Sequence, residues 1–234
     1  MTVAGTPIEM PGDLGRMTGM DVRYAAVRTF PVVDPDTGAV TGAGLWGNAI
    51  LSRHPIRATT AVALPQGEDD ELVEPAGSAG ELAGVRYADA PEGVREPRCA
   101  VVSEIDVDGE LVSLLSTHLT YAGSAQRRRQ AARLLEAADD SAAHAVVVAG
   151  DLNAPIEAAE LSPLRDALID SFSATGTPPG DRRRASCDSD RIDHVLVRGL
   201  DAVACRVVRE AGDLSDHWPV IATLRLPARA TRGG

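Results

Sequence analysis

Four short polar motifs stand where apolar runs of the sequence end or begin. They are Ser116-Thr117-His118-Leu119, Gly150-Asp151-Leu152-Asn153, Arg191-Ile192-Asp193-His194 and Ser215-Asp216-His217. The apolar runs beside them predict β-strands, so the strand ends would gather imidazoles and carboxylates at one edge of a sheet. Such side chains bind divalent cations and activate water, which is the chemistry of metal-assisted phosphoryl transfer.

Each motif taken alone also has a purely structural interpretation. Asp151 and Asn153 could form an Asx turn or a helix cap, because Pro155 follows them. His118 could be an ordinary hydrogen-bonded histidine at a strand end. Asp193 could be a strand-edge carboxylate, and the Asp216-His217 pair could belong to a turn. Their joint occurrence in this order favours a functional site.

The composition sets limits on the class of protein. A chain of 234 residues that is 44% hydrophobic is most simply one domain, residues 1–234. Its net charge of -11 disfavours broad, sequence-independent binding to nucleic acid, although it permits a local basic groove. The three cysteines lack zinc-ligand spacing and predict free thiols. With no export signal and no membrane-spanning run, the expected location is cytoplasmic, or secreted if the natural start lies upstream.

The hydrophobic pattern predicts many strands and two helices. The helices begin at Ser124, as N-cap, and at Pro155, running toward Leu168. Gln66 to Gly84 and Thr175 to Asp190 predict surface loops, and the arginines at 182–184 could reach a phosphate. Residues 1–20 are expected to be irregular and 227–234 a disordered tail. This pattern predicts an α/β or α+β domain with antiparallel pairing. The predicted strands are Val22–Phe30, Trp46–Ser52, Thr59–Leu64, Cys99–Val107, Leu111–His118, Ala145–Ala149, Ile192–Val197, Ala202–Val208 and Val220–Leu226.

At these motifs the chain resembles the endonuclease/exonuclease/phosphatase superfamily of metal-dependent phosphoesterases. The resemblance runs from about Val22 to Leu226 and includes Gly47-Asn48-Ala49-Ile50-Leu51-Ser52-Arg53 and Glu96-Pro97-Arg98. It implies an α/β (α+β) four-layer sandwich with two central mixed β-sheets flanked by helices. It also implies hydrolysis of a phosphodiester or phosphomonoester with Mg²⁺ or Mn²⁺, on a small-molecule, lipid-linked or nucleic acid substrate.

The resemblance also assigns roles, residue by residue. Asp151 and Asn153 would position the attacking water and the scissile phosphate, and His217 would be the catalytic imidazole. Asp193 would orient His217, and His118 would contact the phosphate. The implied metal ligands are Asp216 and Asp151, and the implied supporting residues are Glu96, beside His118, and Asn48.

The start of the chain departs from that family. Its members open with a strand ending in Asn, a helix, and a second strand whose Glu is the main metal ligand. Met1 to Arg16 offers no such unit, so the usual Glu ligand is not found, and Glu9 is not assigned to that role. The sandwich is therefore expected to be N-terminally incomplete, with an exposed sheet edge that favours self-association. Three explanations stay open: a start that lies upstream, a short phosphoester-binding or partner-binding form, and a degenerate fragment.

Overall fold

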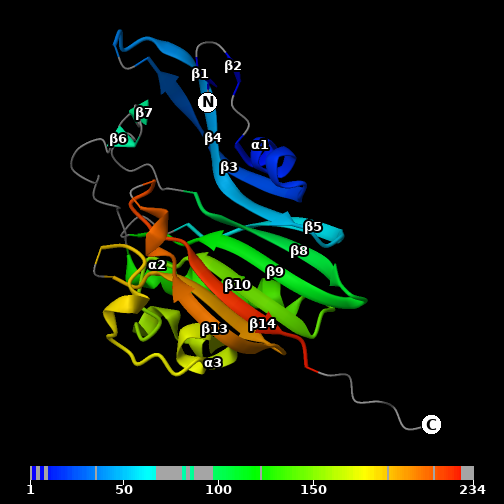
Figure 1. The fold of residues 1–234 in the computed structure, drawn as a ribbon. Helices are drawn as coiled ribbons and strands as arrows, with labels where there is room; N and C mark the ends of the chain where they lie inside the picture. Colours follow the sequence, from blue (N-terminus) through cyan, green and yellow to red (C-terminus); the bar gives the residue numbers. More distant parts are fainter. Residues whose placement is uncertain are drawn as a thin grey trace.

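A six-stranded mixed sheet forms the centre of the computed structural model, in the order β11-β12-β10-β9-β8-β5 (Figure 1). The structure describes residues 2–3, 6–7, 10–34, 36–66, 81–82, 85–86, 97–121, 123–188, 190–212 and 214–227. β9 and β10 run parallel, and the other neighbours pair antiparallel. The strands are β5 (Ile56–Ala63), β8 (Cys99–Val107), β9 (Glu110–His118), β10 (Ala145–Asp151), β11 (Ile169–Asp170) and β12 (Asp193–Arg198).

Helices cover one face of this sheet. Helix α2 (Ser124–Asp139) joins β9 to β10, as parallel neighbours require a crossover. It packs with the 3-10 helix η1 (Ala159–Leu161) and with α3 (Ser162–Ala167). Leu115 and Val148 of the sheet and Leu134 and Leu164 of the helices are fully buried in the same core. Burial of each such side chain stabilises the fold by about 1.5–3 kcal/mol, so this core holds β9 and β10 in position.

Two separate strand pairs cover the other face. β3 (Asp21–Val33) pairs with β4 (Val40–Ser52), and β13 (Asp201–Val207) pairs with β14 (Val220–Arg225). Ile50 of β4 packs against Val101 of β8, whereas Leu224 of β14 packs against Val147 of β10 and its neighbours. No hydrogen bonds join the two pairs within the described ranges, so this layer is divided.

The α/β sandwich expected from the sequence is confirmed, with a divided second layer in place of one mixed sheet. Each predicted strand corresponds to an observed one. The expectation of an irregular segment over residues 1–20 was wrong, because helix α1 (Met10–Thr18) forms there and contacts β3 and β4. Its proline and two glycines have low helix propensity, so the sequence pattern does not predict this helix. Pro11 is nevertheless tolerated in the first turn, and packing stabilises the helix.

The other two helix starts also shifted. Ser124 is the first residue of α2, and Gly123 is its N-cap. The segment after Pro155 first makes a turn and η1, so the α-helix begins only at Ser162. The remaining short elements are β1 (Thr2–Val3), β2 (Thr6–Pro7), β6 (Glu81–Leu82), β7 (Val85–Arg86), α4 (Ser171–Ala174), η2 (Arg182–Arg184) and η3 (Arg209–Ala211).

Several expectations fall outside the described residues, among them Glu9, Glu96, most of the Gln66–Gly84 loop and nearly all of the 227–234 tail. Cys99, Cys187 and Cys205 are free thiols, as expected. Among the helices that the structure describes, none has the length and apolarity needed to span a membrane. Self-association through a sheet edge stays a prediction.

Candidate active site

Three of the expected site residues lie side by side because three neighbouring strands end or begin at the same level. His118 closes β9, Asp151 closes β10 and Asp193 opens β12. The strand register pairs Asp151 with His118 on one side and with Asp193 on the other. Direct cross-strand partners point to the same face of a sheet, so the three side chains share one patch. The Nε2 atom of His118 lies 3.2 Å from Oδ2 of Asp151.

His217 joins this patch from the segment that precedes β14. Its Nδ1 atom lies 2.7 Å from Oδ2 of Asp193, which makes a histidine–carboxylate pair. Ser186 connects Asp193 to the residue that follows His217: its Oγ accepts the Asp193 N–H at 3.1 Å, and its carbonyl accepts the Trp218 N–H at 2.7 Å. No sequence pattern points to Ser186, because it acts through one hydroxyl and its backbone.

Asp151 uses its two carboxylate oxygens differently. Oδ1 accepts the backbone N–H of Asn153 at 2.8 Å, which is the Asx turn anticipated as the structural alternative, whereas Oδ2 faces His118. The side-chain amide of Asn153 donates to the carbonyl of Leu119 at 2.8 Å and so joins the ends of β9 and β10. Structural and functional interpretations of this motif are therefore compatible.

Gly150 is needed for the close approach of two strands. β10 continues through Gly150 to Asp151. At φ +145°, a Cβ on Gly150 would lie 1.9 Å from the carbonyl oxygen of Thr117 on β9. A hydrogen at this position is what allows His118 and Asp151 to end their strands in contact.

The surroundings of His217 and Asp151 shift their pKa values in opposite directions. Burial by itself lowers the pKa of His217, but the hydrogen bond and the charge of Asp193 outweigh it, and the net pKa is raised. Burial by itself raises the pKa of Asp151, but the hydrogen bond and charge of His118 and the Asn153 N–H outweigh it, and the net pKa is lowered. An ionised carboxylate thus lies beside an imidazole that holds its proton more tightly than usual.

The remaining expected residues lie at different distances from this centre. Asp216 is exposed, and its carboxylate accepts a hydrogen bond from Ser215 Oγ at 3.2 Å. Asn48 donates to the carbonyl oxygen of Cys99 at 2.9 Å, which ties β4 to β8. Trp46, which sequence reasoning missed, lies with its ring centroid 6.3 Å from that of His118.

Within the described part of the chain, Asp151, Asp193 and His217 offer ligand atoms that lie within 4.8 Å of one another. Two carboxylates suit a hard divalent cation, so these donors fit a metal site. Asp193 takes part in this group, whereas Asp216 does not. The role of Asp216 as a metal ligand stays a prediction.

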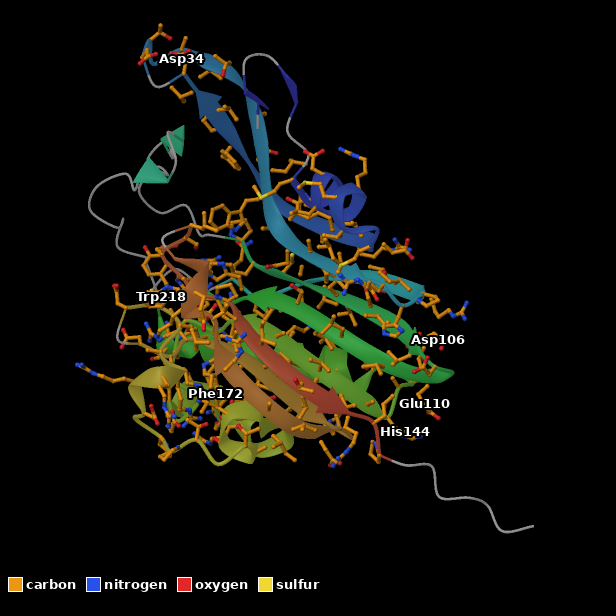
Figure 2. The ribbon with its side chains drawn as sticks, in the orientation of Figure 1. Asp34, Asp106, Glu110, His144, Phe172 and Trp218 are labelled. Carbon is orange, nitrogen blue, oxygen red and sulfur yellow. The ribbon has the colours of Figure 1, made fainter. Side chains whose placement is uncertain are left out.

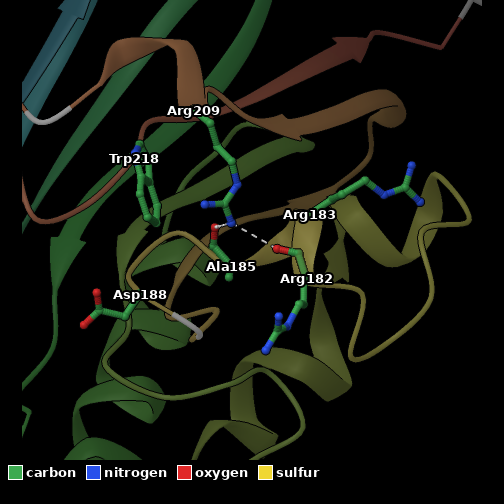
Figure 3. A pocket seen from close by; sticks show the side chains of 6 residues that line it. All are labelled: Arg182, Arg183, Ala185, Asp188, Arg209 and Trp218. Carbon is green, nitrogen blue, oxygen red and sulfur yellow. Dashed lines mark hydrogen bonds between the residues drawn. The ribbon is translucent and has the colours of Figure 1, made fainter.

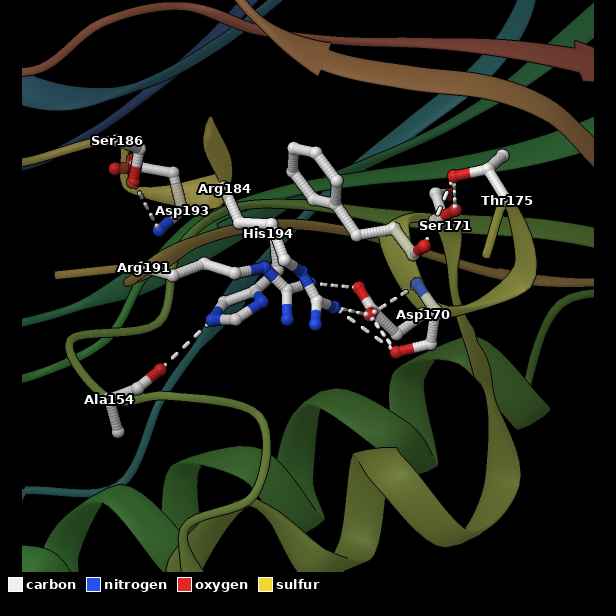
Figure 4. A network of polar contacts seen from close by, with 11 residues as sticks. Ala154, Asp170, Ser171, Thr175, Arg184, Ser186, Arg191, Asp193 and His194 are labelled. Atoms are coloured by element: carbon white, nitrogen blue, oxygen red, sulfur yellow. Dashed lines mark hydrogen bonds and ion pairs between the residues drawn. The ribbon is translucent and has the colours of Figure 1, made fainter. Parts of the chain in front are cut away.

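A buried ionic network supports the start of β12 (Figure 4). Asp170 accepts a hydrogen bond from Arg184 at 2.9 Å and also pairs with Arg191, which stands two residues before Asp193. Both guanidiniums lie over the ring of Phe172. No sequence pattern indicates this network, because Arg184 and Arg191 lie 14 and 21 residues after Asp170.

His194 belongs to this support rather than to the reacting centre. It is 1% exposed, and its Nε2 lies 2.9 Å from the carbonyl oxygen of Ala154. Burial, helped by the charge of Arg191, lowers its pKa to about 4, so the imidazole is neutral at physiological pH.

Solved structures share this fold. A conserved protein of unknown function from Enterococcus faecalis V583 aligns with a TM-score of 0.59 and 17% identity, over 93% of this chain and 81% of its own. The human Nocturnin catalytic domain with bound sulfate aligns with a TM-score of 0.59 and 14% identity, over 92% of this chain and 77% of its own. The mannosyl-6-phosphatase Bt3783 of Bacteroides thetaiotaomicron VPI-5482 aligns with a TM-score of 0.55 and 17% identity, over 92% of this chain and 80% of its own. At these identities the likeness establishes the fold alone.

Sequence comparison establishes the family. A search of curated proteins gave no match. A model of the Endonuclease/Exonuclease/phosphatase family, in contrast, matches residues 9–217. The match spans the strand ends at His118, Asp151 and Asp193 and extends to His217. Together with the shared fold, it establishes that this chain belongs to the Endonuclease/Exonuclease/phosphatase family.

Proposed function

We propose that this chain is a divalent-metal-dependent phosphoesterase that hydrolyses a phosphodiester or a phosphomonoester by in-line attack of an activated water. The observation that carries the proposal is the meeting of the His217–Asp193 pair and the His118–Asp151 pair at one sheet edge. Family membership supports it, and one structural neighbour is itself named a phosphatase.

The geometry suggests a role for each residue. Asp193 accepts the Nδ1 proton of His217, which leaves Nε2 to face the phosphate or the water. Asp151 is ionised at neutral pH and, with Asn153, positions the attacking water. His118 binds a phosphate oxygen. The raised pKa of His217 favours its protonated form, which offsets negative charge on the phosphate.

Asp151 and Asp193, together with Asp216, which directly precedes His217, would hold the metal ion, which we propose is Mg²⁺ or Mn²⁺. When bound, it would offset phosphate charge and stabilise the oxyanions of the displacement. Net charge and the low aromatic content of 3% favour small or lipid-linked phosphoesters over long nucleic acids.

The test is hydrolysis of bis-p-nitrophenyl phosphate with Mg²⁺ or Mn²⁺. We expect EDTA to abolish turnover and His217→Ala to reduce it at least about 100-fold, as for loss of a general acid–base group. His144→Ala is the matched control, because His144 is exposed and lies at the opposite end of the molecule from Trp218 (Figure 2). Binding of the ester without turnover would instead support the alternative, a phosphoester-binding module. A folded chain that neither binds nor hydrolyses it would refute both.

A further inference from the structure

A pocket of about 540 Å³ lies next to the candidate active site (Figure 3). We name it the arginine pocket, and it is lined by Arg182, Arg183, Ala185, Asp188, Arg209 and Trp218. Trp218 directly follows His217. The segment from Ala185 to Asp188 contains Ser186, which fixes both Asp193 and Trp218. The pocket and the reacting centre therefore share a wall.

Arg209 is held in place without a carboxylate partner. Its guanidinium lies 4.3 Å from the centroid of the Trp218 ring, and its Nη2 donates to the carbonyls of Arg182 and Ala185 at 3.0 and 3.1 Å. No ion pair neutralises Arg209 within the described residues. Its guanidinium charge is therefore fixed in position and uncompensated.

The other charged side chains of the pocket do not neutralise the Arg209 guanidinium. Arg182 is exposed, and within the part of the chain that the structure describes it is hydrogen-bonded only through its backbone carbonyl, not through its guanidinium. Arg183 is neutralised by Asp181 at 2.6 Å, and in Figure 3 its guanidinium points away from Arg209. The carboxylate of Asp188 also points away from Arg182 and Arg209 in that view. Two uncompensated guanidiniums thus line one pocket in a chain of net charge -11.

We propose that the arginine pocket is an anion subsite for a second phosphate, so that the substrate is a phosphoester carrying another phosphate group. This proposal rests on the proposed function, because the shared wall brings the pocket next to the scissile ester. The planar fork of a guanidinium matches phosphate oxygens, and Arg209 is already ordered before binding. The pocket has room for a phosphate together with the atoms that connect it to the ester.

The first experiment measures binding alone. Inorganic phosphate is titrated into the metal-free chain by calorimetry, for the wild type, Arg182→Gln and Arg57→Gln. Arg57 pairs with Asp106 on the far part of the central sheet, so its substitution makes the same change in net charge away from the pocket. We expect Arg182→Gln to weaken binding about tenfold and Arg57→Gln to leave it unchanged. Equal affinities in Arg182→Gln and the wild type would overturn the site, and so would equal losses in both variants.

The second experiment separates a substrate phosphate from free phosphate. Two esters that both release p-nitrophenol are compared: thymidine 5′-(p-nitrophenyl phosphate) and the same compound with a 3′-phosphate. We expect kcat/KM to be about tenfold higher for the 3′-phosphorylated ester, and Arg182→Gln to remove that preference while Arg57→Gln retains it. Phosphate binding without this preference would show that the pocket holds free phosphate only, and would overturn the substrate assignment.

Failure of the proposed function gives a different result. If neither ester is hydrolysed, their affinities measured by calorimetry replace kcat/KM in the same comparison. Tighter binding of the 3′-phosphorylated ester that depends on Arg182 would support the subsite without turnover. Equal affinities would overturn it.

Discussion

Replacing Gly150 with alanine tests the idea that close contact between β9 and β10 builds the site. The added methyl group would lie 1.9 Å from the carbonyl oxygen of Thr117, far inside van der Waals contact. Overpacking of this kind costs about 1–3 kcal/mol. The backbone at φ +145° adds about 1–3 kcal/mol of strain for a residue with a side chain. The free energy of unfolding should therefore fall by about 2–6 kcal/mol, a large part of the roughly 5–15 kcal/mol typical of domains.

Gly109→Ala is the matched control. Gly109 also has a positive φ, +86°, but a Cβ there would meet no atom within 4 Å. It lies in the turn between β8 and β9, at the opposite end of β9 from His118. Only backbone strain of about 1–2 kcal/mol is expected for this variant.

Urea unfolding gives the stability of both variants, and bis-p-nitrophenyl phosphate gives their activity. Gly150→Ala should be the less stable variant and should also lose turnover, because separating the strands separates His118 from Asp151. Gly109→Ala should keep its activity. Equal loss of stability in the two variants would refute the close-contact reasoning, and full activity in Gly150→Ala would refute its link to the site.

Three further predictions concern charge. Asp193→Asn removes the charge of the group that accepts the His217 hydrogen bond, and such a charge-assisted bond is worth about 1.5–3 kcal/mol. We expect kcat/KM to fall about 10–100-fold, and equal activity in Asp193→Asn and the surface control Asp201→Asn would contradict this. Mg²⁺ at about 100 times its Kd should raise the free energy of unfolding of the wild type by about 2.7 kcal/mol, and it should not stabilise Asp151→Asn. Identical melting curves of the wild type with Mg²⁺ and with EDTA would count against a metal site. The lowered pKa of His194 makes the stability of the fold depend on pH. Its contribution to the free energy of unfolding is complete above pH 6.5, and up to about 3 kcal/mol of it is lost as the pH falls toward 4, because the unfolded chain is protonated at a higher pH than the folded chain. Urea unfolding between pH 7.5 and 5 should show this slope in the wild type and a flatter one in His194→Leu, and equal slopes would exclude His194 as its source.

The strands were readable from the sequence because their signal is local. Alternating or continuous apolar residues mark a strand wherever its faces are buried, as in Val220–Arg225, where Ile221 and Arg225 are exposed while Leu224 packs inward. Helix α1 was missed for the same reason: its local signal is poor, and contact with β3 and β4 compensates for it.

The amino-acid sequence by itself determined which side chains are candidates for the chemistry, because imidazoles, carboxylates and an amide stand at strand ends in His118, Asp151, Asn153, Asp193 and His217. Only the tertiary structure decided how they pair. Strand register places Asp151 between His118 and Asp193, and Ser186 brings His217 to Asp193. The arginine pocket likewise exists only because Arg209 lies over the ring of Trp218 and donates to the backbone carbonyl of Arg182. Register and long-range contacts depend on the packing of distant segments, and no local pattern encodes that packing.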